Sequence, residues 1–264
     1  MKNSYALVTG ATSGIGLEIS RELARRGYNL ILVARTKERL SKTSRELIKE
    51  YNIKCDYFSS DLTLINSPEE IYQFTNQKKY SIYILVNNAG YALPNAFHIN
   101  SMEDEEKCLR VLGTSVIALT KKYINDMISN GSGKIMIVSS VAAFAPASAL
   151  QALYGPIKTF MNRFNETLNY NYNSMGITST ALCPGYTVTN FHKASGIQDE
   201  MDGVPKFLKK SAKRIAVEGV EAMIKGKKVS VPTKTWKLIV LILKFIPNWI
   251  FSLLSGILAP GRYK

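Results

Sequence analysis

A tyrosine and a lysine four residues apart, Tyr154 and Lys158, are the strongest candidates for acid–base chemistry in this sequence. On a helix, residues i and i+4 lie on one face, so the phenol and the ammonium can approach each other. A phenol with a pKa of about 10 exchanges protons slowly at neutral pH, and a nearby ammonium lowers that pKa because it stabilises the phenolate. Such a pair can give a proton to a carbonyl oxygen or take one from an alcohol. The Tyr-x-x-x-Lys spacing alone would instead indicate an exposed helix face.

Ser140 is the candidate that would assist this pair, because its hydroxyl can hydrogen-bond an oxygen on which charge develops. It follows a short apolar run and precedes Tyr154 by 14 positions. The neighbouring Ser139 is the weaker alternative. Pro156 is compatible with a helix only in its first turn, so we expect the helix that carries the tyrosine and the lysine to begin near Gly155.

A glycine-rich turn lies between the first apolar run and the first helical stretch, at residues 9–16. Glycine lacks a Cβ, so the turn can be tight, its backbone can approach a pyrophosphate, and the helix can pack close to the strand. The free N–H groups and the dipole at the helix N-terminus then favour phosphate. A glycine-rich loop without a ligand is the alternative interpretation. The candidate cofactor-binding residues of this turn are Gly10, Thr12, Ser13, Gly14, Ile15 and Gly16.

Arg35 stands where a dinucleotide fold usually offers an acidic residue to the ribose hydroxyls, at the end of the second strand. The chain has no carboxylate between Val33 and Thr36. A guanidinium can instead pair with the 2′-phosphate of NADP(H) through its planar fork, with Ser13 and Arg39 nearby. We therefore expect NADP(H), with NAD(H) as the less favoured cofactor. The alternative is that Arg35 is only a solvated residue at a helix start.

Short apolar runs alternate with helical stretches over most of the chain. This alternation predicts an α/β fold with a doubly wound, parallel, seven-stranded sheet of Rossmann type, covered by helices on both faces. We expect a single dinucleotide-binding and catalytic domain over residues 1–232. The expected strands are 6–9, 30–34, 55–59, 82–87, 134–139, 178–183 and 229–231, and the expected helices lie near 15–26, 37–51, 68–77, 102–129, 155–174 and 212–225.

Six motifs, taken in order, resemble those of the short-chain dehydrogenase/reductase family, and the resemblance covers residues 4–232. The general layout is similar to that of an NADP-preferring branch whose members reduce carbonyl and acyl substrates. The family resemblance also implies a homodimer or homotetramer. The motifs are Thr9–Gly16, Asp61-Leu62, Asn87–Gly90, Ser139-Ser140, Tyr154 with Lys158, and Pro184–Thr189.

The resemblance implies further cofactor contacts, residue by residue. Tyr154 and Lys158 would lie beside the nicotinamide and its ribose as well as the substrate. One group would meet the adenine, a second would form a backbone wall beyond the fourth strand, and a third would contact the nicotinamide and the phosphates. These groups are, respectively, Asp61 and Leu62; Asn88, Ala89 and Gly90; and Pro184, Gly185, Thr187 and Thr189.

One stretch departs from the family pattern. Many relatives carry an asparagine of a proton relay on the long helix before the fifth strand, and residues 109–114 contain none. Water or Thr114 would have to replace it, or turnover would be reduced. This departure supports a second hypothesis, a weakly active or inactive nucleotide-binding member that serves as a membrane-attached scaffold or redox sensor.

A segment of a different kind follows at 233–264. Residues 236–259 are apolar around the whole helix circumference and are interrupted by Lys244, Pro247 and Asn248. These interruptions disfavour one spanning helix and favour two short apolar helices that meet at the proline. Basic flanks and two tryptophans are typical of a segment that lies in a membrane interface. Covering the substrate pocket or packing against a second subunit are the equally weighted alternatives, and either arrangement predicts an apolar substrate.

Composition narrows the remaining classes. The formal net charge is +14, but the basic residues are scattered and no nucleic-acid-binding motif accompanies them, so we expect no nucleic acid partner. Cys55, Cys108 and Cys183 are odd in number and widely spaced, which favours a reducing compartment. Only His98 and His192 are present, so we expect no histidine-based metal site. The N-terminus lacks a secretory pattern, which predicts a cytoplasmic protein, attached peripherally to membranes if its C-terminal segment lies in an interface.

Together these features predict an oxidoreductase that transfers a hydride between NADP(H) and a carbonyl or alcohol substrate of apolar or acyl type. In such a reaction the cofactor supplies the hydride, and the protein positions it and supplies the proton. Ser140, Tyr154 and Lys158 are the predicted catalytic residues.

Overall fold

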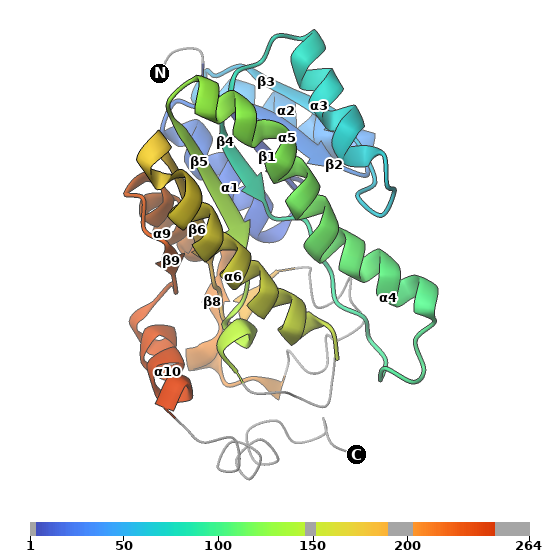
Figure 1. Ribbon diagram of the computed structural model, residues 1–264, viewed down its shortest axis with the longest axis vertical. Helices are drawn as coiled ribbons and strands as arrows, with labels where there is room; N and C mark the ends of the chain where they lie inside the picture. Colours follow the sequence, from blue (N-terminus) through green and yellow to red (C-terminus); the bar gives the residue numbers. More distant parts are fainter. Residues whose placement is uncertain (1–3, 146–151, 190–202, 246–264) are drawn as a thin grey trace.

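The computed structural model describes residues 4–145, 152–189 and 203–245. Within these ranges seven parallel strands form one sheet, in the order β3-β2-β1-β4-β5-β6-β9, with helices on both faces (Figure 1). The predicted doubly wound sheet is confirmed. The strands are β1 Tyr5–Thr9, β2 Asn29–Ala34, β3 Cys55–Ser59, β4 Ile82–Asn87, β5 Gly133–Val138, β6 Ile177–Leu182 and β9 Val229–Ser230.

The strand order reverses at the centre of the sheet, between β1 and β4. The side chains of Ala6, Leu7 and Val8 in β1 are fully buried, as expected for a strand that is covered on both faces. In sheets of this kind a ligand crevice forms at the carboxyl ends of the strands beside such a reversal. The candidate site residues follow the strands β1 to β6, so the fold gathers them along this one edge of the sheet.

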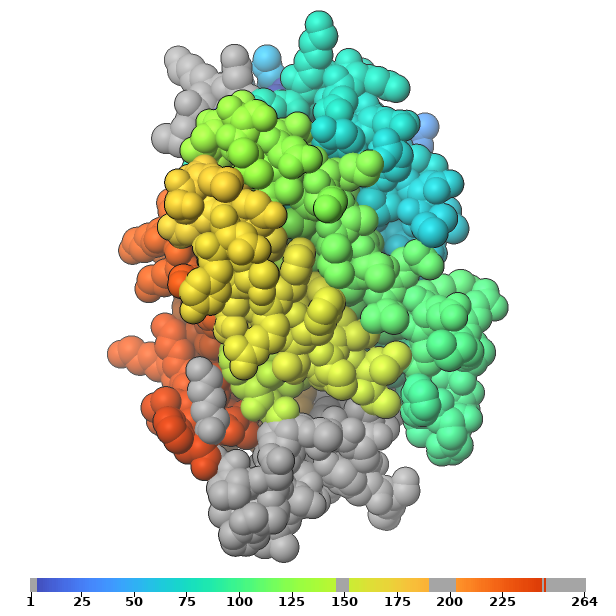
Figure 2. Space-filling model, in the orientation of Figure 1, coloured from blue at the N-terminus to red at the C-terminus, as the bar shows by residue number. Residues whose placement is uncertain are grey.

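The helices form two layers. α1, α2 and α9 cover one face, and α3, α5 and α6 cover the other, each with its own buried apolar cluster (Figure 1). In Figure 2, α6 crosses the middle of the visible face, with α4 and α5 on one side and α9 and α10 on the other. The helices are α1 Gly14–Arg25, α2 Lys37–Tyr51, α3 Ser67–Gln77, α4 Met102–Leu109, α5 Ser115–Ser129, α6 Tyr154–Tyr172, α9 Ala212–Ile224 and α10 Lys234–Phe245.

The single helix predicted over 102–129 is interrupted. A π-helical turn, Arg110–Thr114, joins α4 to α5, and the N–H of Ser115 donates to the carbonyl of Arg110. This is the stretch that lacks the asparagine of the family pattern. Such turns are uncommon and are frequently found at functional sites. Val111 and Leu112 in the turn are buried, and the turn packs against α6.

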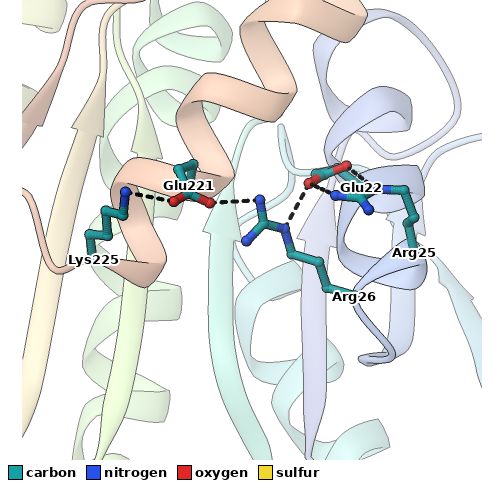
Figure 3. Close-up of polar contacts among 5 residues, drawn as sticks. All are labelled: Glu22, Arg25, Arg26, Glu221 and Lys225. Atoms are coloured by element: carbon teal, nitrogen blue, oxygen red, sulfur yellow. Dashed lines mark hydrogen bonds and ion pairs between the residues drawn. The ribbon is translucent and has the colours of Figure 1, made fainter.

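An ion-pair network joins α1 to α9 (Figure 3). The carboxylate of Glu22, whose side chain is 5% exposed, accepts hydrogen bonds from Arg25 and Arg26. Arg26 also reaches across to Glu221 on α9, with Nη2 2.8 Å from Oε2, and Glu221 in turn lies 2.8 Å from Nζ of Lys225. Because the nearly buried Glu22 has two guanidinium partners, the network compensates its charge while it fixes α1 beside α9.

α10 is the first of the two apolar helices predicted for the C-terminal segment. Pro247 and the second predicted helix fall outside the described residues. A small parallel sheet, β7 Thr187–Val188 with β8 Lys210–Ser211, connects the loop after β6 to the start of α9. In the described part of the chain, none of the helices combines the length and the apolar character that a bilayer span requires.

Candidate active site

Tyr154 and Lys158 lie at the start of α6, beside the carboxyl end of β5. Nζ of Lys158 is 5.5 Å from the centroid of the Tyr154 ring and donates a hydrogen bond of 2.8 Å to the carbonyl of Val138, the last residue of β5. Lys158 is only 5% exposed. The helix begins at Tyr154, one residue before the expected Gly155, and Pro156 lies in its first turn as predicted. The two side chains therefore share one helix face at the sheet edge.

Ser140 occupies the position expected of a partner for Tyr154. It caps a short 3₁₀ turn, where its Oγ accepts a 3.1 Å hydrogen bond from the N–H of Ala142, and it shares a hydrogen bond with the Tyr154 side chain. Ser139 instead donates from its Oγ to the carbonyl of Lys158 at 3.2 Å. The geometry thus brings Ser140 to the tyrosine and assigns Ser139 to holding the backbone of α6.

Burial controls the proton affinities of the pair. It raises the pKa of Tyr154 to about 12, although the hydrogen bond with Ser140 acts in the opposite direction. It lowers the pKa of Lys158 to about 8. The lowered tyrosine pKa expected from the sequence is not what this arrangement produces, because both groups are removed from water and each then favours its neutral form. Lys158 is charged at neutral pH and loses its charge as the pH rises through about 8.

The glycine turn is joined to the end of β4 by Thr9 and Asn88. Oγ1 of Thr9 accepts hydrogen bonds from the N–H groups of Asn88 and Ala89, at 2.9 and 3.0 Å. Nδ2 of Asn88 donates to the carbonyl of Thr9 at 2.8 Å. A Cβ on Gly16 would lie 2.3 Å from that same Nδ2, so the close approach needs glycine. Thr9 is a positioning residue that was not among the predicted cofactor contacts, although it is the first residue of the motif Thr9–Gly16.

The arrangement of this turn fits a pyrophosphate. Gly10 and Gly14 have φ of +65° and +55°, a region that glycine adopts without strain. Ser13 is the N-cap of α1 and its side chain caps no N–H group, so the first N–H groups of the helix remain available to an anion. The six predicted residues of this motif all lie in the turn or in the first turn of α1: Gly10, Thr12, Ser13, Gly14, Ile15 and Gly16. The predicted Gly90 lies in the segment that follows β4.

Two arginines lie near the end of β2, where the adenosine half of a dinucleotide would extend. Arg35 directly follows the strand and Arg39 is in the first two turns of α2; both are exposed, and neither forms an ion pair within residues 4–145, 152–189 and 203–245. Asp61 follows β3, where its Oδ1 accepts a 3.0 Å hydrogen bond from the N–H of Thr63, and Leu62 is buried. The unpaired guanidinium groups suit a phosphate.

The loop after β6 connects the two halves of the site. The N–H of Val141, next to Ser140, donates to the carbonyl of Pro184 at 3.0 Å. At the other end of the loop, Thr189 lies beside the glycine turn, since a Cβ on Gly14 would be 3.3 Å from the Cβ of Thr189. The loop thus runs from the serine turn to the glycine turn. Its other predicted contacts, Gly185 and Thr187, lie between these two points.

The proposed substitute for the missing asparagine, Thr114, is exposed, and its hydroxyl donates a hydrogen bond to the carbonyl of Arg110 at 3.4 Å.

One further residue near the site was not predicted from the sequence. Trp236 of α10 is buried against the loop after β6, a contact that no spacing or motif predicts.

Comparisons with known proteins identify the family of this chain. A family model described as short chain dehydrogenase matches residues 4–200. The chain is 28% identical over 220 residues to the very-long-chain 3-oxoacyl-CoA reductase of Bos taurus, covering 81% of this chain and 69% of that protein. It is 30% identical over 191 residues to the inactive hydroxysteroid dehydrogenase-like protein 1 of Homo sapiens, covering 70% of this chain and 56% of that protein. The match thus spans little more than half the length of the second relative.

Solved structures show the same fold. A short-chain dehydrogenase from Sphingobium yanoikuyae in complex with NADPH superposes with a TM-score of 0.80 at 25% identity, covering 93% of this chain and 96% of that one. The family match covers well over half of the chain, and the structural match includes the sheet and the layers that position the site. This chain is therefore a member of the short-chain dehydrogenase family and an oxidoreductase.

Proposed function

We propose that this protein transfers a hydride between NADP(H) and a carbonyl or alcohol substrate of apolar or acyl type. The observation that carries the proposal is the meeting of Tyr154, Lys158 and Ser140 at the carboxyl end of β5, one loop away from a phosphate-binding turn. The bound cofactor supplies the hydride. The chain supplies the proton, the charge and the orientation of the substrate.

Each catalytic residue has one role in this proposal. In reduction, the hydroxyl of Tyr154 gives its proton to the substrate oxygen, and Ser140, already hydrogen-bonded to Tyr154, holds that oxygen. Lys158 keeps a positive charge beside the phenol, is oriented by Val138, and would reach the nicotinamide ribose. In oxidation, Tyr154 takes the proton back.

The choice of NADP(H) rests on Arg35 and Arg39. Both guanidinium groups are exposed near the end of β2, and Ser13 lies in the glycine turn that follows the neighbouring strand β1. A 2′-phosphate placed there would gain charge-assisted hydrogen bonds. The related structure from Sphingobium yanoikuyae contains NADPH, which supports the same choice.

An apolar or acyl substrate is supported by the rim of the site and by the relatives. Phe97 and Ile99 lie in the loop that follows Gly90 and are 56% and 62% exposed. Apolar side chains that line a binding site favour an apolar ligand, and we propose that these two side chains lie at the rim of the site. The relative from Bos taurus is named for a very long acyl chain on coenzyme A. We propose a carbonyl on an acyl chain as the substrate to test first.

Helix α10 supports the proposal that the protein attaches peripherally to a membrane surface. The outer face of α10 carries Leu238, Leu241, Ile242 and Phe245, which are 59%, 54%, 47% and 79% exposed. The spacing i, i+3, i+4 and i+7 places them on one stripe. Lys234 and Lys237 are exposed at the start of the same helix, and basic residues beside an apolar stripe suit an anionic bilayer.

Compartment, domain limits and assembly belong to the same proposal. The described cysteines are all free thiols, which suits a reducing cytoplasm. We place the catalytic domain at 1–232 and the interfacial segment at 233–264. A homodimer or homotetramer is supported by exposed Leu109 on α4 and Phe160 on α6, which are 42% and 52% exposed.

A second function remains, that of a nucleotide-binding member with little or no turnover. It is favoured by the stretch 109–114, which lacks the relay asparagine, and by a relative that is itself named inactive. In that case the same cofactor site would serve a membrane-attached scaffold or redox sensor.

The deciding experiment is a substrate screen with the purified full-length chain and NADPH. We would use 3-oxoacyl-CoA esters of increasing chain length, steroid ketones and short ketones, and would follow NADPH oxidation. Turnover that rises with the apolar size of the substrate supports the first function. NADPH binding without turnover on any substrate supports the second, and the absence of NADPH and NADH binding contradicts both.

A further inference from the structure

We propose that Trp236 is a positioning residue for the nicotinamide end of the cofactor, so that α10 contributes a residue to the architecture of the active site. The proposal rests on the cofactor site proposed above and adds a residue from outside the motifs. Trp236 holds the loop Pro184–Val188, which runs from the serine turn toward the phosphate turn, in the shape that receives the nicotinamide.

The indole of Trp236 lies directly against the backbone of Gly185. A Cβ on Gly185 would be 2.0 Å from Cε2 of the indole and 2.3 Å from Cδ2 and Nε1, so only glycine allows this approach. Tyr186, the next residue of the loop, packs at the side of the indole with the ring centroids 5.8 Å apart. Trp236 is only 5% exposed, so its buried indole gives the loop a firm packing surface.

The N–H group of the indole makes a further contact with a second segment. Nε1 donates a 3.0 Å hydrogen bond to the carbonyl of Leu208. The chain at Lys210 then pairs with the loop, since its N–H donates to the carbonyl of Tyr186 at 2.9 Å. Trp236 therefore contacts the residues that precede each strand of the small β7–β8 sheet: Gly185 and Tyr186 before β7, and Leu208 before β8.

The loop is also bonded to the catalytic turn. The N–H of Val141, directly after Ser140, donates to the carbonyl of Pro184. The hydroxyl of Thr187 bonds the carbonyl of Gly185 at 2.9 Å inside the loop. The loop is thus held both by the turn that carries Ser140 and by the indole, and α10 packs against that same turn. A shift of the indole would therefore be transmitted to the residues expected beside the nicotinamide.

The entry to α10 is itself constrained. Thr233, a β-branched residue, has φ of +71° and is 3% exposed. Its N–H donates to Oε2 of Glu218 on α9 at 2.8 Å, and its carbonyl accepts from the N–H of Lys237 at 3.1 Å. Such strain persists only where the surrounding structure enforces it, and it is often found at functional sites. The junction fixes the direction from which α10 brings Trp236 to the loop.

A ligand that lacks the nicotinamide separates positioning from general stability. Adenosine 2′,5′-bisphosphate carries the adenine and the 2′-phosphate only. We expect Trp236→Ala to raise the Kd of NADPH about tenfold, while the Kd of the bisphosphate stays within about twofold. Val240→Ala is the matched control, because Val240 is also 5% exposed on α10; it should lower the Tm and leave both Kd values within about twofold.

A second variant covers the case in which Trp236→Ala does not fold. Gly185→Ala places a methyl group in the space of the indole and should raise the Kd of NADPH selectively as well. In a Trp236→Ala background the same methyl group has room, so the two effects should not add. Trp236→Phe should restore part of the affinity, because the ring remains while the bond to Leu208 is lost.

The outcomes are distinguishable. If Trp236→Ala changes the Kd of NADPH and the Kd of the bisphosphate by the same factor, as Val240→Ala does, or leaves both Kd values unchanged, Trp236 is only a core residue and this proposal is wrong. If the unaltered protein binds neither ligand, the proposed cofactor site fails and this proposal fails with it.

Discussion

The ammonium of Lys158 donates a 2.8 Å hydrogen bond to the carbonyl of Val138, the residue that ends β5. This bond places a buried positive charge 5.5 Å from the centre of the Tyr154 ring. Because the bond partner is a strand carbonyl, the lysine is aimed by the sheet itself and not by a mobile loop. The arrangement leads to predictions on proton transfer, on pH and on stability.

Tyr154→Phe should remove the proton donor while it keeps the ring in place. We expect kcat to fall about 100- to 10,000-fold, with the Kd of NADPH within about threefold of the unaltered value. Stopped-flow turnover and an NADPH titration measure the two quantities. Unchanged turnover would exclude Tyr154 as the donor. Tyr170→Phe, an exposed position on the same helix, is the control.

The rate of carbonyl reduction should depend on the charge of Lys158. The pKa of Tyr154, about 12, keeps its proton in place through the neutral range, whereas the pKa of Lys158 is about 8. We therefore expect kcat to be flat below pH 7 and to fall about tenfold per unit above pH 8. Lys158→Met should remove that decline together with most activity. A rate that rises through pH 8 would contradict the assignment.

The same lysine should affect stability with the opposite pH dependence. Its folded pKa lies below the unfolded value, so the unfolded chain binds more protons between about pH 8 and 10.5, and the free energy of unfolding contributed by this group rises with pH over that window. At pH 7 the buried charge is a net cost, and Lys158→Met should stabilise the fold by roughly 1–3 kcal/mol. Urea unfolding at pH 7 and pH 10 tests both statements, and equal stability of the two proteins at pH 7 would count against them.

Arg35→Asp should shift cofactor preference from NADPH toward NADH. A charge-assisted bond to the 2′-phosphate is worth about 1.5–3 kcal/mol, so we expect the ratio of kcat/KM values to move by about 10- to 100-fold. Arg45→Asp makes the same charge change at an exposed position on α2 and should leave the ratio unaltered. The same ratio in both variants would remove Arg35 from cofactor selection.

The network between α1 and α9 should contribute more to the free energy of unfolding than a surface ion pair does. Arg26→Ala removes the bridge to Glu221 and one partner of Glu22, whose side chain is 5% exposed, so we expect a loss of about 1 kcal/mol. Arg163→Ala breaks the exposed pair with Glu166 and should change stability by less than about 0.5 kcal/mol. Urea unfolding of both variants provides the comparison, and equal losses would show that α1 and α9 do not depend on the bridge.

The outer face of α10 should carry membrane binding. Leu241→Glu combined with Phe245→Glu replaces two exposed apolar side chains and should abolish sedimentation with anionic phosphatidylserine vesicles, while turnover on a soluble ketone is kept. Added salt should weaken binding by the unaltered protein, because Lys234 and Lys237 are screened. Equal sedimentation of both proteins would place the membrane contact elsewhere or remove it. Truncation before α10 is a poorer test, since it also removes Trp236.

The layered sheet, the glycine turn after β1 and the tyrosine–lysine pair could all be predicted from the sequence. Each of these is encoded locally: strands and helices by the period of their apolar residues, the turn by glycines that need φ above zero, and the pair by one turn of helix. The same local rule located the start of α6 to within one residue, through Pro156.

The folded structure was needed to show which serine meets Tyr154, how Thr9 joins β1 to β4, and that Trp236 lies on Gly185. It also reversed the expected direction of the tyrosine pKa. These four findings have the same cause. Contacts and desolvation depend on which distant segments become neighbours once the core closes, and no spacing along the chain carries that information.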